Sequence, residues 1–244
     1  MSIFYINLII ATLAVVFASV MQASTGLGVG LLLVPLLALI DINYVPGPVI
    51  LASAVLSFMM MIKEKDHLDV TNIQWVLLGI AFGSLIGVLT LSRVPLELLG
   101  VLFGALIVLA VGLSFLNLRL NFSLPTLLGM GTVSGVMGST AAMGAPVLLL
   151  LYQHHNGKAL RATLGLIYFI SSIMMVSFLR FTDQFGLEQI KLGAMLIPGF
   201  IIGFLIAQPL ARLLDKGYTR PIALLLALGS AFYLIIKSIA RYVV

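Results

Sequence analysis

The sequence contains no cysteine among its 244 residues. This absence excludes disulfide bonds, catalysis by a thiol and any metal site ligated by cysteine. Charged side chains are scarce as well, because Asp, Glu, Lys and Arg make up 9% of the chain, against about 25% in an ordinary soluble domain. So few charges cannot cover the surface of a soluble protein, and the composition therefore excludes that class.

The few charges form short clusters that are separated by long stretches with no charge. A bilayer core about 30 Å thick is crossed by about 20 apolar residues in a helix, and most of the charge-free stretches match that length. Segments such as Leu99–Leu113 are apolar on all sides, whereas a strand of a membrane barrel alternates polar and apolar residues, so the segments are predicted to be helices. Residues 1–23 are predicted to be a retained helix rather than a signal peptide, because no Lys or Arg precedes the apolar run. The sequence thus predicts an all-α polytopic membrane protein with about eight transmembrane helices.

The predicted spans carry no charged residue near their centres. Buried acids mark proton or cation relays in membranes, so their absence disfavours a symporter that couples a cation through a carboxylate. An intramembrane enzyme is also disfavoured, since no serine in the spans has an activating base nearby. His154 and His155 have no further metal ligands nearby in sequence, and we expect neither a metal site nor a cofactor. The net charge of +5 is spread over loops at both faces, so the expected partner is membrane lipid and not nucleic acid.

Two charge-free stretches, residues 1–40 and 120–157, are nearly twice as long as one crossing requires. Glycine costs about 1 kcal/mol relative to alanine inside a helix, and proline removes a hydrogen bond. Both stretches contain such residues together with small polar ones: Gln22, Ser24, Thr25, Gly26, Gly28, Gly30 and Pro35 in the first, and Gly135, Gly138, Ser139, Thr140, Gly144 and Pro146 in the second. Each stretch is therefore predicted to break or turn back inside the membrane.

The order of features repeats along the chain. An overlong, interrupted segment followed by three shorter spans occurs twice, and a shift of 116 residues places Gly28 on Gly144, Met59 on Met175, Gly83 on Gly199 and Gly87 on Gly203. We predict two duplicated halves, residues 1–118 and 119–244, each with an interrupted or re-entrant first segment. The spans are expected near residues 3–23, 47–62, 73–92, 95–116, 121–138, 162–180, 191–210 and 221–239, with residues 26–40 and 139–152 as half-helices or re-entrant pieces. Close helix packing is predicted at two glycine pairs with four-residue spacing, Gly83 with Gly87 and Gly199 with Gly203.

The distribution of basic residues depends on how the interrupted stretches are counted. If each stretch crosses the membrane once, the 13 Lys and Arg residues divide 7 to 6 between the two faces, which does not decide the orientation. If each contributes two segments, the residues divide 8 to 5 and favour a cytoplasmic face with Lys63, Lys65, Arg119, Lys158, Arg161, Arg212, Lys216 and Arg220. The second count gives each half an odd number of segments and would invert the halves relative to each other.

The interruptions form the predicted substrate site. A helix that breaks at membrane depth exposes backbone N–H groups, and its N-terminal end attracts anions without a fixed positive charge. Glycine permits close approach to the backbone, and serine and threonine hydroxyls supply donors. We therefore predict that a small anion is bound by Gln22, Ser24, Thr25, Gly26, Gly28, Gly30, Ser139, Thr140 and Gly144. Close helix packing is the alternative role for these small residues. Other neutral polar residues could line the pathway or bond their own helix backbone, including Ser53, Ser57, Tyr168, Ser171, Ser172 and Gln208.

Two strings of residues, STGLGVGLLLVPLL at Ser24–Leu37 and GVMGSTAAMGAPVLLLLY at Gly135–Tyr152, resemble motifs of the TauE/SafE family of membrane transporters. The resemblance spans nearly the whole chain. It implies export of sulfite, an organosulfonate or a similar oxyanion or carboxylate across a bacterial-type inner membrane. The second string has Ala141, Ala142 and Ala145 where a glycine-rich string like the first would be expected.

The membrane potential favours export over uptake. An inside-negative potential drives an anion outward by about 2.3 kcal/mol per charge per 100 mV, so export needs no coupling carboxylate. A passive channel for a small anionic or neutral solute is the alternative, because the same broken helices could support it. A scaffolding subunit is less expected, since it needs no interruptions. The sequence leaves open the identity of the anion and the oligomeric state, a homo-oligomer included.

Overall fold

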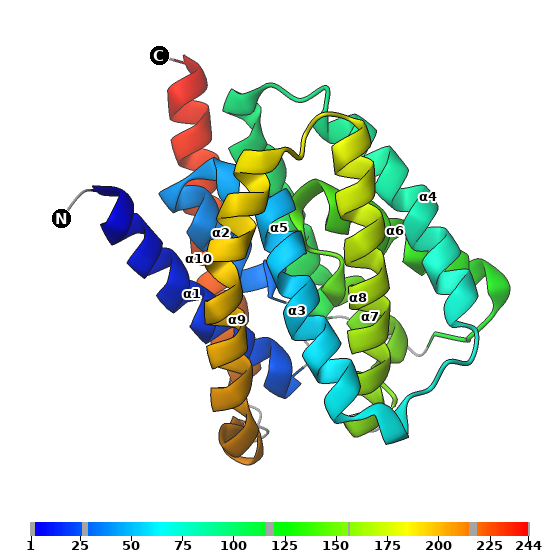
Figure 1. Cartoon of the computed structure of the whole chain (residues 1–244). Helices are drawn as coiled ribbons and strands as arrows, with labels where there is room; N and C mark the ends of the chain where they lie inside the picture. Colours follow the sequence, from blue (N-terminus) through cyan, green and yellow to red (C-terminus); the bar gives the residue numbers. More distant parts are fainter. Residues whose placement is uncertain (1–2, 26–28, 116–119, 156, 215–218, 244) are drawn as a thin grey trace.

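Helices account for almost all of the structure. The computed structural model describes residues 3–25, 29–115, 120–155, 157–214 and 219–243, and these ranges contain no strand. Their helices are α1 (Ile3–Thr25), α2 (Gly30–Ile40), α3 (Gly47–Lys63), α4 (Ile73–Leu91), α5 (Leu96–Phe115), α6 (Leu124–Ala141), α7 (Ala145–Tyr152), α8 (Gly157–Phe181), α9 (Leu187–Leu214) and α10 (Thr219–Val243), with 3-10 turns at Ile42–Tyr44 and Lys65–His67. They pack as one bundle (Figure 1), and the all-α prediction is confirmed.

Length and hydropathy suit these helices to a membrane. Among the described residues, four helices are long and apolar enough to cross a bilayer: Tyr5–Ser24, Ile73–Leu91, Gly157–Phe181 and Leu187–Pro209. Four shorter apolar helices lie at Gly30–Ile40, Gly47–Lys63, Leu98–Ser114 and Leu224–Ala240. The helix α6, which the sequence predicts as a span, belongs to neither set, because its Gly, Ser and Thr residues lower its hydropathy. Large apolar side chains on the outside of the bundle, such as Leu13, Phe82 and Leu225, are 65%, 63% and 69% exposed, which suits a lipid surrounding.

Both overlong stretches are interrupted, as the sequence predicts. The helices α1 and α2 are separate, and so are α6 and α7. The second interruption lies later than expected, because Gly135 and Gly138 are inside α6 and the helix continues to Ala141. A Cβ added at Gly135 would lie 2.8 Å from the backbone nitrogen of Ser84, so this glycine lets α6 pack closely on α4 and does not break the helix.

The backbone of Ala142, immediately after α6, is left-handed, with a φ of 56°. Its N–H donates to the carbonyl oxygen of Gly138 at 2.7 Å, at a position that usually holds glycine. Because this conformation costs other residues about 1–2 kcal/mol, we expect Ala142→Gly to raise the free energy of unfolding by about 1 kcal/mol in detergent. Ala105→Gly, in the exposed middle of α5, is the matched control and is expected to lower it by about 1 kcal/mol. Shifts of the same sign in both variants would contradict the conformation assigned to Ala142.

The loops gather at two opposite ends of the bundle. One group, residues 41–46, 92–95 and 182–186, is called the Asp41 end. In this group the ring of Phe185 packs on Gly47. The side-chain amide of Gln184 donates to the carbonyl oxygen of Val88 in α4 at 3.2 Å.

The other group, residues 64–72, 120–123 and 153–155, is called the Asp69 end. The rings of Phe122 and His155 lie with centroids 5.7 Å apart, and His155 Nε2 lies 3.3 Å from a carboxylate oxygen of Asp69. Since α3, α4 and α8 each connect a loop of one group to a loop of the other, these helices cross the whole bundle.

The first interrupted stretch forms a hairpin that enters from the Asp41 end. The helix α1 runs in the direction of α9, because Gly199 packs on Val15 and Gly203 packs on Ser19, and α9 starts at the Asp41 end. Thus α1 points toward the Asp69 end, and α2 returns to Asp41.

The second interrupted stretch forms a hairpin that enters from the opposite end. The helix α6 runs in the direction of α4, because Gly83 packs on Thr132 and Gly87 packs on Ser139, and α4 starts at the Asp69 end. The helix α7 returns toward that end and finishes at Tyr152. The predicted close packing by the paired glycines is thereby confirmed for both pairs.

The tips of the two hairpins meet inside the bundle. Gly30, the first residue of α2, lies directly against the backbone of Ala142 and Met143. A Cβ added at Gly30 would lie 2.8 Å from the carbonyl carbon of Ala142 and 3.3 Å from the Cα of Met143. The two interruptions, more than 100 residues apart in sequence, are therefore in direct contact.

Candidate functional site

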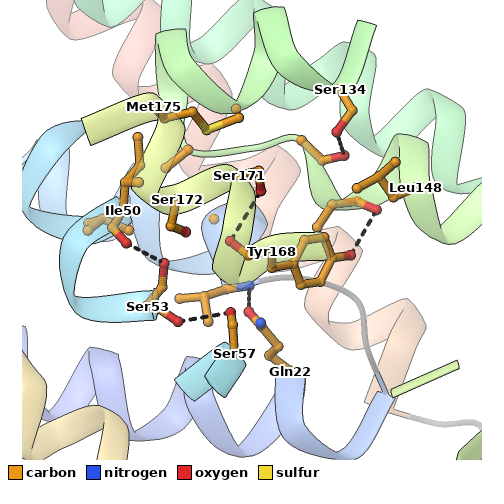
Figure 2. Close-up of a pocket in the computed structure, with 17 residues that line it drawn as sticks. Gln22, Ile50, Ser53, Ser57, Ser134, Leu148, Tyr168, Ser171, Ser172 and Met175 are labelled. Atoms are coloured by element: carbon orange, nitrogen blue, oxygen red, sulfur yellow. Dashed lines mark hydrogen bonds between the residues drawn. The ribbon is translucent and has the colours of Figure 1, made fainter. Parts of the chain in front are cut away.

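A cavity of about 60 Å³ lies beside the contact between the two tips (Figure 2). A single water needs roughly 10–15 Å³ of such space, so the cavity admits a solute of a few non-hydrogen atoms. Six helices and both interruptions contribute to its wall, through Gln22, Val29, Gly30, Val49, Ile50, Ser53, Ser57, Ser134, Gly138, Ala142, Gly144, Ala145, Leu148, Tyr168, Ser171, Ser172 and Met175.

Two helix N-termini face this cavity. The helix α2 starts at Gly30 and α7 starts at Ala145, and both residues line the wall. The first N–H groups of a helix have no partner in the helix itself, and the helix dipole gives this end a partial positive charge. The N–H of Val29, one residue before α2, donates to the side-chain oxygen of Gln22. The partial positive charges of the two helix ends therefore face the same small space.

Hydroxyl groups supply the other polar atoms of the wall. Five of them donate to backbone carbonyl oxygens at 2.9–3.4 Å, namely those of Ser53, Ser57, Ser134, Tyr168 and Ser171. Ser172 is 7% exposed, and within the described residues it has no hydrogen-bond partner (Figure 2). Its hydroxyl is therefore free to donate to a solute in the cavity.

No Asp, Glu, Lys, Arg or His is among the described residues that line the cavity. Charged groups lie instead at the ends of the bundle. At the Asp69 end, hydrogen bonds from the side chain and the backbone N–H of Thr71 hold the pKa of the Asp69 carboxyl below its ordinary value. The electrostatics of the cavity therefore come from helix ends and hydroxyl groups, which favour an anion or a neutral solute over a cation.

The model of one protein family, the sulfite exporter TauE/SafE family, matches residues 11–234 of the chain. The chain belongs to this family. The predicted resemblance is thereby confirmed, and the TauE/SafE chain is an integral membrane transporter of a family of sulfite and anion exporters. The family consists of transporters and not of enzymes, in agreement with the sequence prediction. Comparisons with curated proteins and with solved structures give no match.

The predicted site residues of this TauE/SafE member separate into three groups. Gln22, Gly30 and Gly144 line the cavity. Ser24, Ser139 and Thr140 do not: Ser24 donates to the Val20 carbonyl within α1, and the other two lie against Gly87 of α4. Thr25 is the last residue of α1, while Gly26 and Gly28 lie outside the described residues. Substrate binding by these nine residues stays a prediction.

Most of the cavity's hydroxyl groups come from residues that the sequence suggested only as lining candidates. Ser53, Ser57, Tyr168, Ser171 and Ser172 all line it, whereas Gln208 lies in a separate pocket. Ser134 was not predicted at all. Its hydroxyl donates to the carbonyl oxygen of Gly144 at 2.9 Å and so joins α6 to the start of α7. The only sequence signal for it was its place in the interrupted stretch, next to Gly135.

Proposed function

We propose that this TauE/SafE transporter exports a small anion through the central cavity between the two hairpins. The expected substrates are sulfite, an organosulfonate, or a similar oxyanion or carboxylate. The observation that carries this proposal is the convergence of two helix N-termini, those of α2 and α7, on one cavity. Such ends bind anions through backbone N–H groups and need no basic side chain.

The size and the polar groups of the cavity support the same substrate class. A volume of about 60 Å³ suits a solute as small as sulfite. An oxyanion offers several acceptors, and Ser172 offers a donor that no protein group uses within the described structure. Hydrogen bonds to a charged group are worth about 1.5–3 kcal/mol each, so a few of them offset much of the loss of hydration.

We propose in addition that residues 1–118 and 119–244 are inverted repeats. The hairpins α1–α2 and α6–α7 enter from opposite ends, which supports an inverted relation. The packing of α1 on α9 and of α6 on α4 is reciprocal, and it uses glycine pairs that a shift of 116 residues superimposes. In transporters of this kind the substrate binds at the interface of the repeats, and the repeats move to expose it to each side in turn.

The hairpin geometry also supports one orientation in a bacterial-type inner membrane. Each interrupted stretch contributes two segments, which is the count that divides the basic residues 8 to 5. The larger group includes Lys63, Lys65, Lys158 and Arg161, so the Asp69 end is proposed to face the cytoplasm.

Flux measurements in proteoliposomes test the proposed transport. Vesicles loaded with sulfite, methanesulfonate, sulfate or a short carboxylate should show saturable efflux and counterflow for at least one anion. An inside-negative potential should accelerate this efflux, because it drives an anion outward by about 2.3 kcal/mol per charge per 100 mV. Uptake that requires a H⁺ or Na⁺ gradient at zero potential would contradict potential-driven export. Flux that neither saturates nor shows counterflow would identify a passive channel instead.

A further inference from the structure

A second pocket lies between the central cavity and the Asp69 end. Its volume is about 30 Å³, and its walls include Met60, Lys63, Glu64, Arg161, Phe204 and Gln208. Met60 separates the two spaces, because its sulfur lies 3.9 Å from the side-chain nitrogen of Gln22, which lines the central cavity. Gln22 and Met60 thus bring the walls of the two pockets into contact at this point.

The second pocket continues outward into a more open groove of about 250 Å³. Lys63, Phe204 and Gln208 line both spaces, and the other walls of the groove are the apolar side chains of Phe58, Met59 and Ile62. The groove and the second pocket are therefore neighbours, and the second pocket meets the central cavity at the contact of Met60 with Gln22.

The charges of the second pocket suit an anion. Arg161 Nη2 lies 3.1 Å from Glu64 Oε1, and the two side chains are 20% and 13% exposed. The ammonium group of Lys63 lies 5.7 Å from the centre of the Phe204 ring. Two basic side chains against one acid leave the pocket with a net positive charge. The Glu64 carboxylate is itself an oxyanion, so it occupies on Arg161 the kind of bond that a substrate would make.

We propose that this pocket, called the Lys63 subsite, binds the anion between the cytoplasm and the central cavity. Lys63 and Arg161 hold a small oxyanion or carboxylate there in competition with Glu64, and displacement of Met60 from Gln22 admits it to the central cavity. The assignment of the anion rests on the proposed function. A basic subsite of this kind raises the local concentration of an anion next to a cavity that has no charged side chain of its own in the described structure.

Sulfite binding to the purified protein tests this subsite. Isothermal titration calorimetry at low ionic strength, in a Ser172→Ala background that weakens the central site, should still detect sulfite. Lys63→Gln and Arg161→Gln should each weaken this binding roughly fivefold, and added salt should reduce the difference. Glu64→Gln should strengthen it, because it removes the competing carboxylate. Lys65→Gln is the matched control, since Lys65 is exposed at the same end and does not line the pocket, and it should leave binding unchanged.

Glu64→Gln and Arg161→Gln distinguish charge from structural damage. Both remove the same ion pair, so a purely structural role would shift sulfite binding in the same direction in both variants, and that result would overturn the subsite. The absence of sulfite binding in the Ser172→Ala background would overturn it as well. Lys63→Gln keeps the test decisive if Arg161→Gln fails to fold, because Lys63 is outside the ion pair. If vesicle flux fails while these opposite binding shifts are observed, the transport proposal is wrong and the anion subsite stands.

Discussion

Replacing Gly30 by alanine is expected to abolish transport and to lower the free energy of unfolding by about 3 kcal/mol. The added Cβ would lie 2.8 Å from the carbonyl carbon of Ala142 and closer still to its oxygen. The obstacle is the backbone of the other hairpin, which cannot rotate away as the end of a flexible side chain could. The two tips would have to separate, and the helix ends that line the cavity would no longer converge on it.

Gly129→Ala provides the matched control for Gly30→Ala. Gly129 lies in α6, and a Cβ added there would meet nothing within 4 Å. Because alanine is the better helix former, the free energy of unfolding of this variant is expected to rise by up to about 1 kcal/mol. Thermal unfolding in detergent and efflux from proteoliposomes would be measured for both variants. Normal melting and flux in Gly30→Ala would show that the hairpin tips are not in the contact described.

Replacing Ser172 by alanine is expected to weaken anion binding without weakening the fold. The Ser172 hydroxyl makes no hydrogen bond within the described residues, so its removal leaves no protein group unpaired. A hydrogen bond to a charged solute is worth about 1.5–3 kcal/mol, which corresponds to at least a roughly tenfold rise in Kd. The KM of efflux should rise with it, while the melting temperature stays at or above that of the wild type.

Ser177→Ala is the control on the same helix. The Ser177 hydroxyl is exposed and donates to the carbonyl oxygen of Ile173 at 2.8 Å, away from the cavity. We expect the Ser177→Ala variant to transport the anion as the wild type does. The absence of cysteine allows an additional check, because Ser172→Cys would place a single thiol in the chain. An organosulfonate should slow the labelling of that thiol, and labelling that no anion affects would argue against a bound anion at this position.

Helix positions followed from local sequence signals. The predicted spans at residues 47–62 and 73–92 correspond to α3 at Gly47–Lys63 and α4 at Ile73–Leu91. Hydropathy and the absence of charge act on each segment separately, so they locate a span without knowledge of its neighbours. The interruptions could also be predicted locally, since glycine and proline destabilise the hydrogen-bonded helix wherever they occur.

The exact place of the second interruption did not follow from glycine content. Gly135 and Gly138 stay helical, because α6 is enclosed by its neighbours and these positions permit close contact with α4 and with Met175. The chain turns instead at Ala142, where a left-handed backbone is held by tertiary packing against the local preference of alanine. Local propensity is overridden here by contacts that the sequence does not display.

The direction of each polar side chain depended on the tertiary structure as well. Ser139 and Thr140 look like binding residues in sequence, yet they face Gly87, whereas Ser134 lies five residues before Ser139 and lines the cavity. Successive residues of a helix point about 100° apart, so a small rotation of α6 decides which of them meets a solute. That rotation is set by the packing of α6 on α4.

The sequence by itself determined that the chain crosses a membrane as helices and that two of its segments break, because hydropathy, glycine and proline act through the local backbone. Only the tertiary structure decided that the two breaks touch, that Ser172 lines the cavity beside them, and that Met60 separates this cavity from Lys63. These relations depend on how helices far apart in sequence are packed and rotated against one another, and no local pattern of residues specifies that.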